Sequence, residues 1–122
     1  MRRPTASFDR VRLAPFDVVV VPFPYADRLA EKRRPALIIS SAKLRPYGLV
    51  WVCMITSAEN ERWPSDLPVS DLNRAGLPAQ SVIRPAKIAC IEATRIERRI
   101  GSLDKANARA VVQRLRGFLG GA

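Results

Sequence analysis

Four consecutive valines, Val18 to Val21, form the centre of the segment FDVVVVPF at residues 16–23. Branching at Cβ restricts these side chains in a helix and suits them to a pleated sheet, so the run predicts a buried strand. Pro22 and Pro24 follow, and neither has a backbone N–H to donate to a neighbouring strand. The segment therefore predicts a short strand whose pairing ends at these prolines.

Short apolar segments recur along most of the chain. Further strands are predicted at residues 36–40, 49–55, 66–69, 81–84 and 87–93, with Pro85 separating the last two. The segment YADRLAEKRR at residues 25–34 is polar and charged, which predicts an exposed loop between the first two strands. Trp51 lies within an apolar segment and is expected in the core.

The apolar period changes to that of a helix near the end of the chain. From Leu103 onward, apolar residues recur at helical spacing, namely Val111, Val112, Leu115, Phe118 and Leu119. Ser102 or Asp104 is a suitable N-cap, and Gly120 and Gly121 end the helix. Short strands followed by one amphipathic helix predict a mostly β fold of the α+β class, a small antiparallel barrel with a helix packed on it.

The length of 122 residues fits a single domain, and 48% apolar residues are enough to form its core. We expect a basic N-terminal arm at residues 1–14 and one barrel domain at residues 15–122. No apolar run approaches the roughly 20 residues that span a bilayer, so no membrane segment is expected. Asp9 and Arg10 stand where the apolar part of a signal peptide would lie, which favours a cytoplasmic protein.

The charge balance favours a polyanionic partner, most simply a nucleic acid. The chain has 21 Lys and Arg against 11 Asp and Glu, a net charge of +10, and 17 of the cations are arginine. Arginine grips phosphate through a planar fork of donors. Histidine is absent, which excludes Ser-His-Asp and Cys-His pairs and histidine metal ligands. Cys53 and Cys90 form no CxxC pair and are expected to be small buried hydrophobes, so neither a metal nor a cofactor is predicted.

The order of several motifs resembles the MazF/PemK family of toxin ribonucleases. The motifs are FDVVVVPFP, a polar loop, KRRPALIIS, VCMITS and AGLPAQSVIRPAKIACIEATRIERRIG, over residues 15–119. The most specific are the step Arg34-Pro35-Ala36 and the pair Thr56-Ser57. This resemblance implies an SH3-like barrel, a homodimer, metal-independent cleavage of single-stranded RNA at short sequences, and a cognate antitoxin whose acidic tail occupies the RNA groove.

By position, the family's catalytic arginine and threonine correspond to Arg34 and Thr56. The residues expected to contact RNA are Lys32, Arg33, Ser57, Gln80, Ser81 and Arg84. The chain departs from the family at two positions. Phe16 stands where a glycine usually precedes the first strand, and Gln80 stands where some members have an acidic residue.

These residue types suit the implied chemistry. Cleavage of RNA without a metal requires attack of the ribose 2′-OH on the adjacent phosphorus. The Arg34 guanidinium can stabilise the charge on the phosphorane, and the Thr56 hydroxyl can donate to a phosphate oxygen or relay a proton. Arginine keeps its proton up to about pH 12, so the general base is left unassigned.

Each of these candidate residues also has an alternative interpretation, in which its role is structural. Arg34 follows Lys32 and Arg33 in a charge run typical of a solvated face, and Arg95, Arg98 and Arg99 are either a phosphate track or such a face. Gln80, Ser81 and Arg84 fit a polar strand edge as well as an RNA groove. Trp63 is expected to anchor its loop, and Asp17 to bond local backbone or an arginine.

Three functions stay open on the sequence. The first is a ribonuclease, the second a nucleic-acid-binding barrel without catalysis, and the third a gyrase-inhibiting toxin like the CcdB group, which shares the implied fold. The CcdB group acts through an aromatic-containing C-terminus, whereas this chain ends FLGGA. The loop at residues 25–33 directly precedes Arg34 and is expected to become ordered when RNA or the antitoxin binds.

Overall fold

The computed structural model of the chain describes residues 12–23 and 32–121. Its elements are β1 Asp17–Phe23, β2 Lys32–Ile38, η2 Ala42–Tyr47, β3 Leu49–Ser57, β4 Leu67–Pro68, α1 Leu72–Ala75, β5 Ser81–Glu92, η3 Ala93–Arg95, β6 Arg98–Ser102 and α2 Lys105–Phe118. The basic arm predicted at residues 1–14 lies largely outside the described residues. The same holds for the loop at residues 25–33, which was predicted to become ordered on binding.

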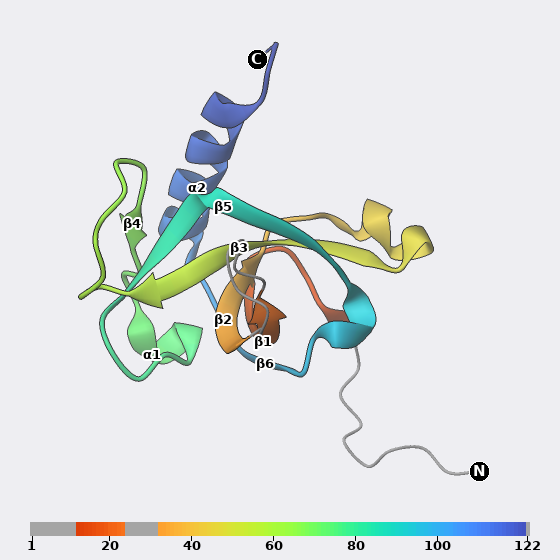
Figure 1. Cartoon of the computed structure of the whole chain (residues 1–122), viewed down its shortest axis with the longest axis horizontal. Helices are drawn as coiled ribbons and strands as arrows, with labels where there is room; N and C mark the ends of the chain where they lie inside the picture. Colours follow the sequence, from red (N-terminus) through yellow and green to blue (C-terminus); the bar gives the residue numbers. More distant parts are fainter. Residues whose placement is uncertain (1–11, 24–31, 122) are drawn as a thin grey trace.

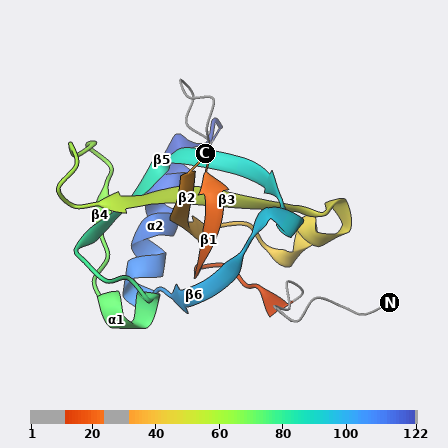
Figure 2. The same cartoon turned by 60° about the horizontal axis from the view of Figure 1, so that its bottom comes forward.

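Six strands form one sheet in the order β4-β5-β3-β2-β1-β6, and all its pairings in the described parts of the chain are antiparallel. The sheet curls into a half-barrel, with β3 and β5 crossing above β1, β2 and β6 in Figure 1. Figure 2 shows the same curl from below, with α2 behind the sheet. The predicted fold class, a mainly antiparallel barrel with a C-terminal helix, is confirmed.

The valine run is buried because β1 contributes to a core on each side of the sheet. Val19 and Val21 pack in the cluster inside the half-barrel, together with Ala36 of β2. Val18 points to the opposite side and packs with Leu37 in the second cluster. Successive side chains of a strand alternate between its faces, so a strand buried on both sides needs an uninterrupted apolar sequence.

Helix α2 covers the second cluster and begins as predicted. Asp104 is its N-cap, and the carboxylate accepts the backbone N–H of Asn107 over 2.8 Å. Val111 is fully buried and packs in one cluster with Cys53 and Ile55 of β3. Among the described residues, no helix has the length and apolar character needed to cross a membrane.

Three predicted boundaries are wrong. Lys32 to Arg34 belong to strand β2, not to an exposed loop. The strand predicted at residues 66–69 is reduced to Leu67–Pro68. The two strands predicted on either side of Pro85 are one strand, β5, because a bulge opposite Cys53 and Met54 takes up residues 85–87 and removes the need for a donor at Pro85.

Elements without an apolar pattern were not predicted. Strand β6 carries two arginines and a glycine, yet it pairs with β1 at the edge of the sheet. The short helices η2, η3 and α1 likewise lack a long apolar stripe. Phe16, which replaces the family's usual glycine, has φ of 72°, a left-handed conformation that costs a non-glycine residue about 1 kcal/mol or more.

Two side chains predicted to be buried are exposed. Trp51 lies on the outer side of β3, beyond the area that α2 covers, and is 47% exposed. Cys90 stands opposite Trp51 on β5 and is also exposed, and it forms no disulfide. Cys53 is buried as predicted, and burial raises the pKa of its thiol to about 12, which makes it unreactive.

Candidate functional site

The predicted site residues gather at one end of the sheet. Because neighbouring strands run antiparallel, the ends of β1 and β3 lie beside the beginnings of β2 and β5. This end carries Lys32, Arg33, Arg34, Thr56, Ser57 and Ser81. Strands from three different parts of the sequence therefore bring most of the predicted set together.

Arg34 and Thr56 occupy matching positions on neighbouring strands. β2 and β3 pair from Ile38 opposite Val52 to Ala36 opposite Met54. Arg34 and Thr56 each stand two residues beyond this last pair, on the side of the sheet that Ala36 and Met54 face. The pairing of the two strands ends at Ala36, next to Pro35, which lacks a backbone N–H. The strands thus separate where the cation and the hydroxyl face the same side of the sheet.

Arg34 lies on the inner side of the half-barrel. It pairs with Val21 of β1, and its Nε atom is buried. Arg33, the next residue, has the opposite orientation because side chains alternate along a strand. Its Nε donates to Glu97 over 2.6 Å in an ion pair whose arginine side chain is 72% exposed. Arg33 and Arg34 therefore do not form one cationic cluster.

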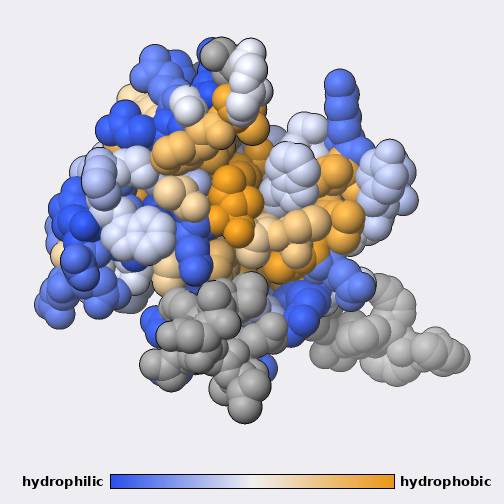
Figure 3. All heavy atoms as spheres, turned by 45° about the horizontal axis from the view of Figure 1, so that its top comes forward, coloured by the Kyte–Doolittle hydropathy of each residue, from blue (hydrophilic) through white to orange (hydrophobic). Residues whose placement is uncertain are grey.

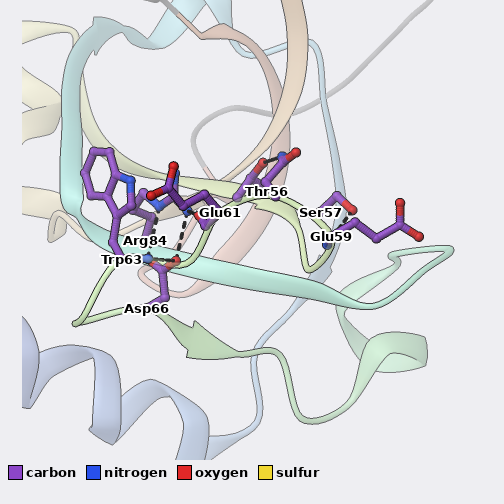
Figure 4. Close-up of polar contacts among 8 residues, drawn as sticks. Thr56, Ser57, Glu59, Glu61, Trp63, Asp66 and Arg84 are labelled. Atoms are coloured by element: carbon purple, nitrogen blue, oxygen red, sulfur yellow. Dashed lines mark hydrogen bonds and ion pairs between the residues drawn. The ribbon is translucent and has the colours of Figure 1, made fainter.

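The Thr56 hydroxyl is held by a side chain from the following loop. Thr56 is 8% exposed, and its Oγ1 accepts a hydrogen bond of 2.6 Å from Nδ2 of Asn60. Figure 4 labels Thr56 near the end of β3, with a dashed line at its hydroxyl. Among the residues around Thr56, Asn60 was not predicted, because one asparagine in a polar loop carries no distinctive sequence signal.

The same loop, residues 58–66, is clamped to β5 by Arg84. The guanidinium donates to both carboxylate oxygens of Asp66, over 3.0 Å from Nε and 2.9 Å from Nη2, and to the carbonyl of Glu61 over 2.7 Å. Trp63 stacks on it, with 4.3 Å from the guanidinium carbon to the ring centroid. These contacts, drawn in Figure 4, confirm that Trp63 anchors its loop. The Arg84 side chain is 8% exposed, and its role in RNA contact stays a prediction.

The ion pair also fixes the charge of Asp66. Burial by itself would raise the pKa of this carboxyl, but hydrogen bonds from Arg84 and from the backbone N–H of Trp63, together with the charges of Arg84 and Arg62, hold it below the ordinary value. Asp66 is therefore a buried carboxylate at neutral pH. Arg84 and the backbone N–H of Trp63 donate to its oxygens, so Asp66 stabilises the conformation of the loop.

The other polar residues predicted to contact RNA line the end of the β3–β5 pair. Ser57 stands opposite Ser81, and Gln80 accepts the backbone N–H of Ala58 through its carbonyl. The side chain of Gln80 is exposed, as is that of Ser57. Because side chains alternate along a strand, Ser57 and Ser81 face the opposite side of the sheet from Thr56. They are accessible to an extended ligand that passes around this end of the sheet.

Asp17 lies away from this group and has a structural role, as predicted. Its carboxylate accepts the backbone N–H of Ala14 over 2.9 Å and pairs with Arg99 over 3.1 Å. Within residues 12–23 and 32–121, no three His, Cys, Asp or Glu side chains are grouped so that they could hold a metal ion. The site instead offers a guanidinium and a hydroxyl on the same side of the sheet, an arrangement suited to the oxygens of one phosphate.

Comparison with known proteins gives a family and a fold. The model of the PemK-like, MazF-like toxins of type II toxin-antitoxin systems matches residues 14–119. The solved Mycobacterium tuberculosis toxin MazF-mt6 is 22% identical with a TM-score of 0.66, over 83% of this chain and 93% of that one. MazF (Form-I) from Deinococcus radiodurans is 22% identical with a TM-score of 0.71, over 88% and 96%.

A complex is also among the similar structures. The match to MazE-MazF (Form-II) from Deinococcus radiodurans has 21% identity and a TM-score of 0.67, over 90% of this chain and 97% of that chain. A comparison with curated protein sequences found no match. At these identities, the likeness to solved structures shows the fold.

Proposed function

Because the chain belongs to the PemK-like, MazF-like toxins of type II toxin-antitoxin systems, we propose that it is a sequence-specific endoribonuclease that cleaves single-stranded RNA without a metal ion. The observation that carries this proposal is that Arg34 and Thr56 face the same side of the sheet, each two residues beyond the last pair of β2 and β3. A cation and a hydroxyl on one side of the sheet match the groups that a phosphoryl transfer requires.

The proposed reaction is an attack of the ribose 2′-oxygen on the adjacent phosphorus. The new 2′-O–P bond forms as the P–O5′ bond breaks, which gives a 2′,3′-cyclic phosphate and a 5′-OH. The 2′-OH loses its proton and the 5′-oxygen gains one. Arg34 stabilises the charge on the phosphorane, and Thr56 donates to a non-bridging oxygen, while the base that takes the 2′ proton is unassigned.

The surroundings of the pair provide a path for the rest of the RNA. The exposed side chains of Ser57 and Gln80, and the partly exposed Ser81, lie at the end of β3 and β5 that carries Thr56, with Ser57 and Ser81 on the opposite face of the sheet. Lys32 is exposed at the start of β2, on the side of Arg34. We assign to these residues the contacts that hold the strand across the reacting phosphate.

We also propose that a cognate antitoxin binds at the same end of the sheet. MazE-MazF complexes are among the solved structures with this fold. The chain carries a net charge of +10, which favours an acidic protein segment as well as RNA. An acidic antitoxin segment bound there would block the access of RNA to Arg34 and Thr56.

We further propose that two copies associate through the outer side of β3 and β5. Trp51, Ile88 and Cys90 are exposed there, and Phe118 continues the helix stripe of Val111 that faces the sheet. Figure 3 shows apolar side chains gathered on the face of the molecule that lies at the top of Figure 1, where β5 runs. An apolar area of this kind on a small domain is typical of an interface.

The test is incubation of the purified chain with a long single-stranded RNA in the presence of EDTA, followed by mapping of the fragment ends. Cuts at a short recurring sequence, with cyclic phosphate and 5′-OH ends, are expected, and Arg34→Ala should lose them while it stays folded. Binding of several different RNAs without any cut would contradict the proposal and favour a nucleic-acid-binding barrel.

A further inference from the structure

The hydrogen bond from Asn60 determines the direction in which the Thr56 hydroxyl can donate. Nδ2 of Asn60, whose residue is exposed, donates over 2.6 Å to Oγ1 of the buried Thr56. A hydroxyl has one proton and two lone pairs. Because the amide N–H takes one lone pair, the hydroxyl proton points away from Asn60.

The position of Asn60 is fixed by bonds on both sides of it in the sequence. Its backbone N–H donates to the carbonyl of Ser57 over 3.1 Å, and the N–H of Glu59 donates to the Ser57 hydroxyl over 3.1 Å. On the other side, the carbonyl of Glu61 accepts from Arg84, which also holds Asp66. The loop therefore holds the amide of Asn60 against Thr56.

The loop is attached to one neighbour of β3, and Arg34 belongs to the other. Residues 58–66 are bound to Arg84 of β5, whereas Arg34 is on β2, and β3 lies between these two strands in the sheet. A proton that points away from Asn60 is left to donate to a ligand bound on the side of the sheet that Thr56 and Arg34 share. This is the side on which a phosphate bound to the Arg34 guanidinium would lie.

We propose that Asn60 is a positioning residue, which directs the proton of the Thr56 hydroxyl towards the scissile phosphate. The inference rests on the proposed ribonuclease function and adds a residue to it. Asn60 does not contact the RNA and no proton moves to or from it. Its N–H also polarises the Thr56 hydroxyl and so strengthens the hydrogen bond that this hydroxyl donates.

The first experiment measures the steady-state cleavage of an RNA that contains the recognition sequence by N60A, with N73A as the matched control. Asn73 is an exposed asparagine in α1, far from Thr56 in the sequence. N60A should lower kcat about 10-fold, the effect of one hydrogen bond, with KM within about twofold of the wild-type value. N73A should cleave like the wild type. An unchanged kcat in N60A overturns the inference.

A double-mutant cycle separates positioning from a purely structural role. If Asn60 acts through the Thr56 hydroxyl, N60A should cause no further loss in a T56A background. A disordered loop would instead lower cleavage in both backgrounds to a similar extent. That outcome overturns the inference.

The pH dependence of cleavage by N60D gives a further test. The side chain keeps its size, but its ionised carboxylate can only accept, so it draws the Thr56 proton away from the phosphate. Once protonated, the introduced carboxyl can donate to Oγ1 as the amide does. The kcat of N60D relative to wild type should therefore rise as the pH falls through the pKa of that carboxyl, and a ratio independent of pH overturns the inference.

Different results would contradict the ribonuclease function and the role of Asn60. If the wild-type chain cleaves no RNA, the ribonuclease function is wrong, and the role of Asn60 falls with it. If the wild type cleaves and T56A does not, but N60A cleaves as fast as the wild type, the function stands and only the role of Asn60 is wrong.

Discussion

Thr56 is a residue whose local position determines what its hydroxyl can do. A threonine at the end of a strand is ordinary, because β-branched residues favour strands. Here the threonine is buried, its hydroxyl accepts a bond from Asn60, and its side chain faces the same side of the sheet as Arg34. With no histidine in the chain, the proposed reaction depends on a guanidinium and a hydroxyl that stabilise charge.

Thr56→Ala should lower the rate of RNA cleavage by roughly 100- to 1,000-fold, the usual effect of one donor to a transition-state oxyanion. The hydroxyl is removed from the edge of a β ladder whose backbone pairing continues, so thermal unfolding should change little. Thr94→Ala, at an exposed threonine in η3, is the matched control and should cleave like the wild type. Cleavage by Thr56→Ala within threefold of the wild-type rate would rule out the assigned role.

At the scale of elements, the loop at residues 58–66 depends on one buried ion pair. The side chains of Asp66 and Arg84 are 0% and 8% exposed, and Trp63 covers the guanidinium. Removing one member of such a pair leaves a buried charge without its counterion, which is costly. The clamp therefore couples the stability of the fold to the shape of the loop beside Thr56.

Asp66→Asn should lower the free energy of unfolding by about 3 kcal/mol at pH 7. Because the pKa of Asp66 is lowered in the folded state, its contribution is present above the unfolded pKa of about 4 and is lost as the pH falls through the folded value. Urea denaturation at a series of pH values should show the gap between wild type and variant closing below about pH 4.

Glu59→Gln is the control for that series, since Glu59 is an exposed carboxylate in the same loop. It should alter the stability by no more than about 0.5 kcal/mol. A gap between wild type and Asp66→Asn that stays constant across the acid range would show that the ion pair does not contribute as described.

The predictability of these elements follows from what each one packs against. The valine run and the stripe of α2 have apolar patterns because they cover a core, and both were predicted. Lys32 to Arg34 were predicted as a loop because they are charged, yet they pair with β1 beyond the end of the apolar part of β2. Trp51 was expected in the core, because a sequence does not reveal how far α2 extends over the sheet.

The sequence also does not reveal the tertiary contacts that build the site. Arg34 and Thr56 were identified through the family resemblance, and the family match confirms that resemblance. The contacts from Asn60 to Thr56 and from Asp66 to Arg84 depend on how the loop folds back over β5. Such a path is determined by tertiary contacts, so the polar loop residues gave no local signal.

At the scale of the whole molecule, the surface divides into a charged end and an apolar side. The site is at the end of the half-barrel where β2 and β3 separate, while Trp51 and Ile88 are exposed on the outer side of β3 and β5. A homodimer built on this outer side would leave the site of each copy open to RNA or to an antitoxin. The proposed assembly is thus compatible with the proposed activity.

Trp51→Glu should convert the proposed dimer into a monomer, because it places a charge in the centre of the apolar area. Sedimentation velocity at micromolar concentration measures the change. Gln113→Glu is the matched control, since it adds the same charge to an exposed position of α2 and should leave the dimer intact. A wild-type chain that sediments as a monomer, or a Trp51→Glu variant that sediments as a dimer, would contradict the proposed interface.

The central claim is that Arg34 and Thr56 act together on one phosphate, and a double-mutant cycle of cleavage rates tests it most directly. Arg34→Ala and Thr56→Ala should each lower single-turnover cleavage in EDTA by roughly 100- to 1,000-fold. If both act on the same transition state, the double variant should be little slower than the slower single variant. Wild-type cleavage by either single variant, or losses that multiply in full, would contradict the account.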